Sequence, residues 1–455
     1  MGTFLGILVG LLVLSVMMLV HELGHFLAGK SLGFKIISFN LFMGPVLWKK
    51  IGKDGVAYTI RLIPMGASVE FAGEDSGINE LPEDSRAGSA PKQEQTATFE
   101  ADDPGLFFNR PKWARAIVVA MGPLVNFLTA ALAFIILFSA FGGTNLPKIG
   151  QVVGGAAGYE AGLREGDRIL SINGYGISTA MDFNMATTFD PQEVDDYRIR
   201  RPNGEEVNLL VQKEYEDRYR LGISYTPRED GRMIVGAVDP NSNGAHPVLK
   251  VDDEILSING VSVQDPKAFT ANIDQDHAQT IELEILRDHE KMTLEMQTVF
   301  FRDSKDPGIY LAVSDKFGDC LQQGLLYPHS VIKSTIKGLG MIFSGEIKAK
   351  DGLTGPIGIV SMVGGVVQEE VDVAAKVAQL LMLFGLISVA VGFTNLLPIP
   401  PFDGFHLLIL LIEGVSRKEI PEKVKNIFST VGIILLLLLV AYVFYIDIAR
   451  LIAAR

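Results

Sequence analysis

Two histidines and a glutamate lie close together in the segment His21-Glu22-Leu23-Gly24-His25. If this segment is helical, His21 and His25 lie one turn apart on the same face, so both imidazoles can reach one zinc ion. Glu22 lies beside them, where a carboxylate can take a proton from a metal-bound water. The five-residue pattern alone is only moderately specific, because it also occurs by chance. Its meaning therefore depends on the elements that surround it.

The pattern lies inside a long apolar run. From Thr3 to Ala28 the sequence is almost wholly apolar apart from the pattern itself, and about 25 helical residues are enough to cross the ~30 Å hydrocarbon core of a bilayer. Charged residues are costly inside a span and are usually functional. A cleaved signal peptide is the alternative, but residues 1–4 lack the basic segment that such peptides carry. We expect a transmembrane helix over about residues 4–28.

Three further apolar runs cover about residues 116–141, 377–397 and 427–447. Of the 455 residues, 48% are apolar and 20% are charged, and the mean hydropathy is positive. This mixture indicates membrane spans joined to water-soluble parts. We predict a multi-pass α-helical membrane protein with about four transmembrane helices, whose membrane core comprises residues 1–147 and 373–455.

Basic residues gather near one end of each span. They are Lys30, Lys35, Arg110, Lys112, Arg115, Arg417, Lys418, Lys423 and Lys425. Because loops rich in lysine and arginine stay in the cytoplasm, the segment between the second and third spans should lie outside it, as should both chain ends. We therefore place the chain in the cell membrane, whether inner or plasma membrane. The net charge of −13 argues against a nucleic-acid surface, which needs a basic stripe.

The segment between the second and third spans repeats itself. Residues 162–174 match residues 248–260 at a fixed offset of 86 residues, and each copy contains Ile-Leu-Ser-Ile followed by Asn-Gly. This pattern predicts a strand and a tight turn. We expect two tandem α+β modules, at 148–228 and 229–315. Both resemble the PDZ domains of bacterial membrane proteases.

Modules of this kind can bind an extended peptide by adding it to a sheet edge. Residues 219–223 and 307–311 are candidate edge strands with their peptide-binding loops. The alternative is that one or both modules are spacers or steric gates.

A catalytic zinc ion held by two histidines needs a third protein ligand and an open position. The single cysteine, Cys320, excludes a cysteine-based site, and the 40 residues after His25 contain no histidine or glutamate. Asp403 is the best candidate, because the prolines between Asn395 and Gly404 break the third span, and irregular backbone at membrane depth is tolerated where it lines a cavity. From the predicted orientation, His21 and Asp403 both lie near the cytoplasmic leaflet. We therefore predict zinc bound by His21, His25 and Asp403.

The motifs together resemble the site-2 protease family of intramembrane zinc metalloproteases. They are the His-Glu-x-x-His pattern in the first span, Gly122-Pro123-Leu124-Val125-Asn126 in the second, and Asn-x-x-Pro-x-Pro-x-x-Asp-Gly over residues 395–404. The similarity covers essentially the whole chain, including residues 353–359 and 447–451. One departure is Phe405, where the family usually has glycine, and this bulky residue should reshape the pocket.

The resemblance implies further site residues. Residues 37–71 would form a membrane-reentrant β-hairpin, and its alternating pattern from Val56 to Ile63 fits strands. Arg61 and Gly66 of this hairpin would lie near the active site, where they and Phe405 would contact the substrate. Asn395 resembles the family residue thought to handle the substrate backbone or the oxyanion, although a packing role is an alternative.

Two segments carry no predicted chemistry. Residues 73–103 are acidic and rich in Ser, Pro, Gly and Gln, which predicts a flexible cytoplasmic loop. Residues 316–372 form a linker, in which the pattern over 321–347 predicts an amphipathic helix that lies either on the membrane surface or against a PDZ module.

The resemblance implies cleavage of single-span membrane proteins within or near their transmembrane helix, with Zn²⁺ as cofactor and Glu22 as general base. Substrates of the family include anti-sigma factors already trimmed by another protease, and remnant signal peptides are further candidates. Two other functions are considered. One is a zinc transporter, but a transporter would spread its ligands along a pathway. The other is a PDZ-bearing membrane scaffold with an inactive zinc site, and only the intact Glu22 argues against it.

Overall fold

The computed structural model describes residues 2–74, 102–188, 192–227, 233–238, 248–263, 280–369 and 371–453. The chain divides into two units, which are described separately. The first comprises Met1–Leu146, Ser178–Met185 and Val313–Phe444. The second comprises Pro147–Ile177, Ala186–Ala312 and Tyr445–Arg455. Most of the predicted loop at 73–103 lies outside the described residues.

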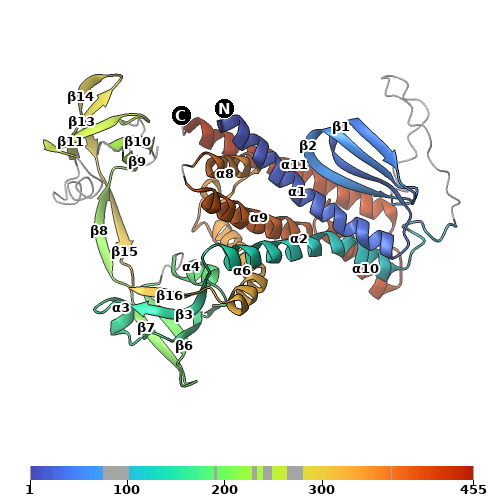
Figure 1. Cartoon of the computed structure of the whole chain (residues 1–455), viewed down its shortest axis with the longest axis horizontal. Coiled ribbons are helices and arrows are strands. Elements are labelled where there is room, and N and C mark those ends of the chain that lie inside the picture. Colours follow the sequence, from blue (N-terminus) through green and yellow to red (C-terminus); the bar gives the residue numbers. More distant parts are fainter. Residues whose placement is uncertain are drawn as a thin grey trace. The chain divides into compact units, whose positions relative to one another are not determined.

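Four helices of the described chain are long and apolar enough to cross a membrane. They are α1 (Gly2–Ser31), α2 (Lys112–Ala140), α9 (Val373–Asn395) and α11 (Glu422–Ala453). Each coincides with a predicted span, which confirms the prediction of four apolar helices. In the first unit α2 packs against both α1 and α9, and these three helices can be followed side by side in Figure 1.

The first unit contains further helices. They are α6 (Phe317–Ser344), α7 (Ala349–Gly352), α8 (Pro356–Gln368) and α10 (Asp403–Ser416). The glycines of α1 allow α8 to approach closely, since a Cβ on Gly6 would lie 2.7 Å from the Cα of Gly364. Neither α8 nor α10 was expected from the sequence, because each apolar run is shorter than a span.

Helix α6 packs against α2 and α9, with the Tyr327 ring 4.7 Å from the ring of Phe134. It also contacts helix α4 (Ala180–Thr188), where buried Asp182 accepts a hydrogen bond from Ser330 at 2.8 Å and pairs with Lys333 at 2.9 Å. The contacting part of α4 belongs to the first unit, so α6 packs here within that unit. Whether the predicted amphipathic helix lies on the membrane surface or against a PDZ module stays a prediction.

Strands β1 (Ile36–Ile51) and β2 (Ala57–Phe71) form the expected hairpin and pack along α1. Residues 38–41 pair with 67–70 on one side and with 57–60 on the other, so the hairpin folds back on itself. The buried Ser15 hydroxyl donates to the Pro64 carbonyl at 2.7 Å, which fixes β2 to the helix. Large apolar side chains remain exposed on the hairpin, namely Ile37, Met43, Val46, Leu47, Trp48, Ile51, Ile60, Leu62, Ile63 and Met65.

The second unit contains two six-stranded sheets of matching design. The first has the order β16-β3-β4-β6-β7, with β5 beside β4; its strands are β3 (Thr144–Val152), β4 (Arg168–Ile172), β5 (Tyr175–Gly176), β6 (Val194–Arg200), β7 (Glu206–Gln212) and β16 (Ile309–Ser314). The second has the order β14-β13-β11-β10-β9, with β12 beside β11; its strands are β9 (Ile223–Pro227), β10 (Met233–Val238), β11 (Glu254–Ile258), β12 (Val261–Ser262), β13 (Thr280–Arg287) and β14 (Glu290–Gln297).

The sequence repeat is visible in the interactions within each sheet. Buried Asp167 pairs with Arg201 at 2.7 Å in the first copy, and buried Asp253 pairs with Arg287 at 2.6 Å in the second. Both residues of the second pair follow those of the first by the same 86 positions. The repeat therefore includes a structural ion pair as well as the Ile-Leu-Ser-Ile strand.

The second copy lies in sequence between strands of the first sheet. Strand β16 follows the second copy in sequence but is the edge strand of the first sheet, whereas β9, which begins before residue 229, is the edge strand of the second. A separate ribbon of β8 (Tyr215–Arg220) and β15 (Val299–Ser304) carries the chain out of the first copy and back. The strands thus do not divide at the predicted boundary of 228/229, because pairing of β16 with β3 joins segments that are distant in sequence. Of the two segments predicted as edge strands, 307–311 overlaps β16. The other, 219–223, contains the end of β8 and only the first residue of β9.

Candidate metal centre

Helix α1 carries the two histidines on one face, as the spacing predicts. His21 and His25 are each 7% exposed, and their Nε2 atoms are 3.1 Å apart. The glycine between them permits a close helix crossing, since a Cβ on Gly24 would lie 2.4 Å from the carbonyl oxygen of Met121 in α2. Both imidazoles are therefore held between two helices.

Asp403 is brought to the histidines by the break after α9. The segment 396–402 turns the chain, and Asp403 begins α10. Only glycine fits at the next position, because a Cβ on Gly404 would lie 2.2 Å from the carbonyl oxygen of Leu396. The Oδ2 atom of Asp403 lies 3.0 Å from Nε2 of His21 and 3.4 Å from Nε2 of His25.

The three side chains fit a zinc ion. One ligand-type atom from each of His21, His25 and Asp403 lies within 4.8 Å of the other two, and a tetrahedral ion with bonds of roughly 2.0–2.1 Å holds neighbouring ligand atoms about 3.3 Å apart. Within the described residues, Oδ2 of Asp403 is buried and receives no hydrogen bond. A cation bound there would satisfy it.

Helix α2 supports both imidazoles from behind. Nδ1 of His25 lies 2.9 Å from the Val118 carbonyl oxygen, and Nδ1 of His21 lies 3.3 Å from the Asn126 amide nitrogen. Between them Gly122 leaves the space that the rings occupy, because a Cβ there would lie 2.3 Å from Nε2 of His25. These α2 residues recur every four positions and so share one helix face. The sequence motif contained Gly122 and Asn126, but it did not show which face of α2 packs against α1.

Glu22 is tied to the hairpin. Its Oε2 accepts a hydrogen bond of 3.0 Å from the backbone N–H of Val69 in β2. One α1 turn earlier, the Met18 side chain contacts the position of Gly66, whose φ of +80° suits glycine. Strand β2 therefore lies along the helix face that carries the candidate base.

The residues predicted to bind substrate lie outside the three-residue cluster. Arg61 donates to the Gly44 carbonyl within the hairpin at 3.3 Å. Asn395 is the half-buried last residue of α9. Phe405 is buried in the first turn of α10, with its ring 5.9 Å from that of His406. Their roles stay predictions.

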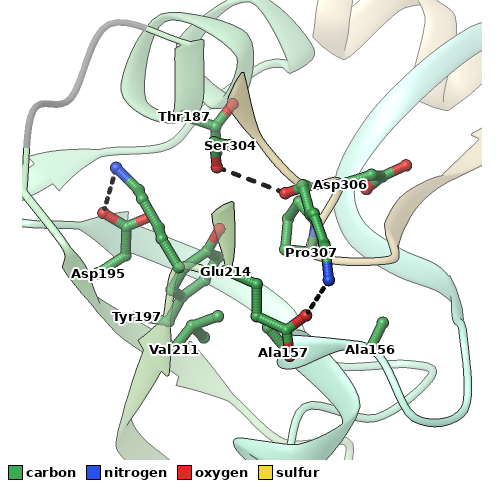
Figure 2. A pocket seen from close by; sticks show the side chains of 12 residues that line it. Ala156, Ala157, Thr187, Asp195, Tyr197, Val211, Glu214, Ser304, Asp306 and Pro307 are labelled. Carbon is green, nitrogen blue, oxygen red and sulfur yellow. Dashed lines mark hydrogen bonds and ion pairs between the residues drawn. The ribbon is translucent and has the colours of Figure 1, made fainter. Parts of the chain in front are cut away.

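A cavity in the second unit lies beside the loop that leads into β16 (Figure 2). It is lined by Thr187, Tyr197, Val211, Ser304, Asp306 and Pro307, among others. Four of its charged groups form two ion pairs, since Lys213 lies 3.2 Å from Asp195 and Lys305 lies 3.3 Å from Glu214. The cluster of His21, His25 and Asp403 lies in the first unit.

Comparison with known proteins bears on this centre. The family described as "Peptidase family M50" matches residues 9–439. The chain belongs to peptidase family M50. The family match covers all three residues of the cluster, and relatives of this M50 chain at 25 to 26% identity are named as zinc metalloproteases. The M50 chain is accordingly a zinc metalloprotease.

Two relatives carry more specific names. The "Regulator of sigma E protease" of Haemophilus influenzae is 26% identical over 97% of this chain and 98% of its own length. The "Protease RseP" of Yersinia pestis is 25% identical over 96% of this chain and 97% of its own length. The M50 chain therefore matches these relatives along nearly their whole length.

Proposed function

We propose that this metalloprotease cleaves single-span membrane proteins within or beside their transmembrane helix, using zinc held by His21, His25 and Asp403. The observation that carries the proposal is the convergence of these three ligand atoms within 4.8 Å on helices of an apolar, helical unit. Polar ligands are expensive at membrane depth unless they serve a function. A site at that depth can reach bonds that a soluble protease cannot.

When bound, zinc polarises the scissile carbonyl and lowers the pKa of water so that it can attack. The chain's own residues do the rest. Glu22 takes the proton of the attacking water and then delivers it to the leaving amine, while the Val69 N–H orients its carboxylate. Burial of the histidines excludes competing water from their nitrogens.

The hairpin is the proposed substrate platform. A transmembrane helix hides its peptide bonds in internal hydrogen bonds, so the substrate must be unwound before cleavage. An unwound segment can pair with a strand edge, and β2 already contacts Glu22. The exposed apolar side chains of the hairpin fit a segment that dips into the bilayer as a reentrant element. Arg61, Gly66, Asn395 and Phe405 would line the path of this substrate.

The two repeated modules are proposed to be extracytoplasmic PDZ domains that filter substrates by size or bind their peptides. The active site would lie near the cytoplasmic leaflet of the cell membrane. The names of the relatives support a role in sigma-E regulation, with anti-sigma factors trimmed by a site-1 protease as substrates. Remnant signal peptides are a second proposed substrate class.

Reconstitution in vesicles tests this proposal. Full-length protein is incubated with a single-span model substrate, and cleavage by the wild type is compared with that by Glu22→Gln, by Asp403→Asn and by chelator-treated protein. The wild type alone should cleave, and readdition of zinc should restore the chelated sample. Cleavage that persists in Glu22→Gln refutes the assigned base. A folded, zinc-loaded wild type that cleaves no single-span substrate would instead favour the scaffold function.

A further inference from the structure

Asn126 is the side chain of α2 that faces His21. It is fully buried, and its Nδ2 atom lies 3.3 Å from Nδ1 of His21. Its Oδ1 atom is also buried and has no hydrogen-bond partner among the described residues. A buried amide oxygen without a hydrogen-bond partner destabilises the protein, because it loses its hydrogen bond to water. The arrangement leaves one atom of the amide unsatisfied.

The chemistry of a metal-binding imidazole decides which amide atom should face the ring. A neutral histidine that binds a metal through Nε2 carries its proton on Nδ1, which must then donate a hydrogen bond. For His25 the acceptor is unambiguous, because Nδ1 faces the Val118 carbonyl oxygen at 2.9 Å. For His21 the amide of Asn126 is the partner, and a half-turn about its last bond exchanges Oδ1 and Nδ2 within the same volume.

We propose that Asn126 is a positioning residue that accepts the Nδ1–H of His21 through Oδ1 and so presents Nε2 of His21, unprotonated, to the metal. This role rests on the proposed zinc site. It gives Oδ1 a donor, moves Nδ2 to the amide position that has no partner among the described residues, and makes the support of the two histidines alike, with a carbonyl-type oxygen behind each ring. The Asn126 backbone is itself fixed, because the buried Ser388 hydroxyl of α9 donates to its carbonyl oxygen at 2.9 Å.

Zinc affinity of the purified full-length protein, measured by competition with a chromogenic chelator, tests the proposal without any need for cleavage. Asn126→Leu keeps the volume but removes the acceptor, and it should weaken zinc binding about 10- to 100-fold. Asn126→Asp keeps an acceptor oxygen and cannot donate, and it should bind zinc within a few-fold of wild type or more tightly. Thr129→Val is the matched control, since its hydroxyl bonds only backbone carbonyls and the Ser388 hydroxyl in the described contacts of this interface.

Three outcomes would overturn the proposal. They are wild-type zinc affinity in Asn126→Leu, a loss in Asn126→Asp as large as in Asn126→Leu, and a loss in Thr129→Val of the same size. If Asn126→Leu does not fold, the Asn126→Asp result decides alone, because an essential amide donor would make it lose zinc. A wild type that binds zinc but cleaves nothing would refute the proposed function and leave this inference standing.

Discussion

Gly122→Ala is the sharpest perturbation that the structure suggests. The added Cβ would lie 2.3 Å from Nε2 and 2.5 Å from Cε1 of His25, and 2.9 Å from Cε1 of His21. Ordinary contact needs about 3.4 Å or more, so the rings or the helices must move by roughly 1 Å. Zinc sites tolerate only about 0.2 Å in their bond lengths. We expect zinc affinity to fall at least 100-fold and proteolysis to be lost.

Helix propensity alone predicts that Gly122→Ala stabilises the protein, so a loss of zinc affinity would be due to the contact with the histidine rings. Alanine is favoured over glycine inside a helix by about 1 kcal/mol. Gly340→Ala in α6 is the matched control, because nothing lies within 4 Å of its added Cβ. Zinc affinity by chelator competition and thermal unfolding in detergent should be measured on both variants. A Gly122→Ala protein that binds zinc with wild-type affinity would refute the reasoning.

Three further changes test other parts of the site. Val69→Pro removes the N–H that orients Glu22, and it should lower kcat about 10-fold or more with unchanged zinc content, whereas Val69→Ala should retain kcat. Asp403→Asn should abolish most zinc binding in the chelator assay while the fold, followed by circular dichroism, persists. Burial alone would raise the pKa of Glu413. The hydrogen bonds from Lys425 and from the Ile420 N–H, together with the charges of Lys425 and Lys112, outweigh burial and hold this pKa below its usual value. A carboxyl group whose pKa is lowered by folding stabilises the folded protein at pH values above its unfolded-state pKa of ~4.3. This stabilisation is lost as the pH falls through the folded-state pKa. The melting temperature of wild type should therefore exceed that of Glu413→Gln at pH 6 to 8, and the difference should shrink below about pH 4.

The sequence predicted the spans because length and apolarity are local properties. It underestimated their ends, since α2 begins at Lys112 and α11 at Glu422 rather than at the first apolar residue. Charged residues at a membrane surface continue a helix at little cost. Helix α10 was missed because the prolines before Asp403 signalled only a break, although an acidic first residue suits the positive end of a new helix.

The nested strand order could not be predicted from periodicity. Alternation identifies a strand but carries no information about its partner, and β16 pairs with β3 across the whole second copy. The repeat of 86 residues marked the copies correctly as related units. Which edge strand closes which sheet depended on long-range pairing.

For the site residues too, local spacing could be predicted from the sequence and long-range packing could not. His21, Glu22 and His25 are recognisable because one helix holds them at fixed spacing. Asp403 was predicted as a ligand by excluding other ligand types, and the structure places it beside the two histidines. The supporting role of Asn126 depends on the rotation of α2 about its own axis, which no spacing within α2 reveals. Its burial in an apolar span was the available signal, since a buried amide there calls for a partner.

Helix α2 contacts both α1, which carries the two histidines, and α10, which carries Asp403. It contributes no predicted ligand, yet it contacts α1 through Val118 and Asn126, and α10 through Lys112, whose ammonium lies 3.1 Å from the Glu413 carbonyl oxygen. The histidines and Asp403 thus share a common support although Asp403 follows His25 by 378 positions. Because packed helices move as rigid units and the spacing of zinc ligands tolerates little change, a shift of α2 must alter both halves of the site together. The geometry of the proposed metal site therefore depends on helix packing and not on the His-Glu-x-x-His segment alone.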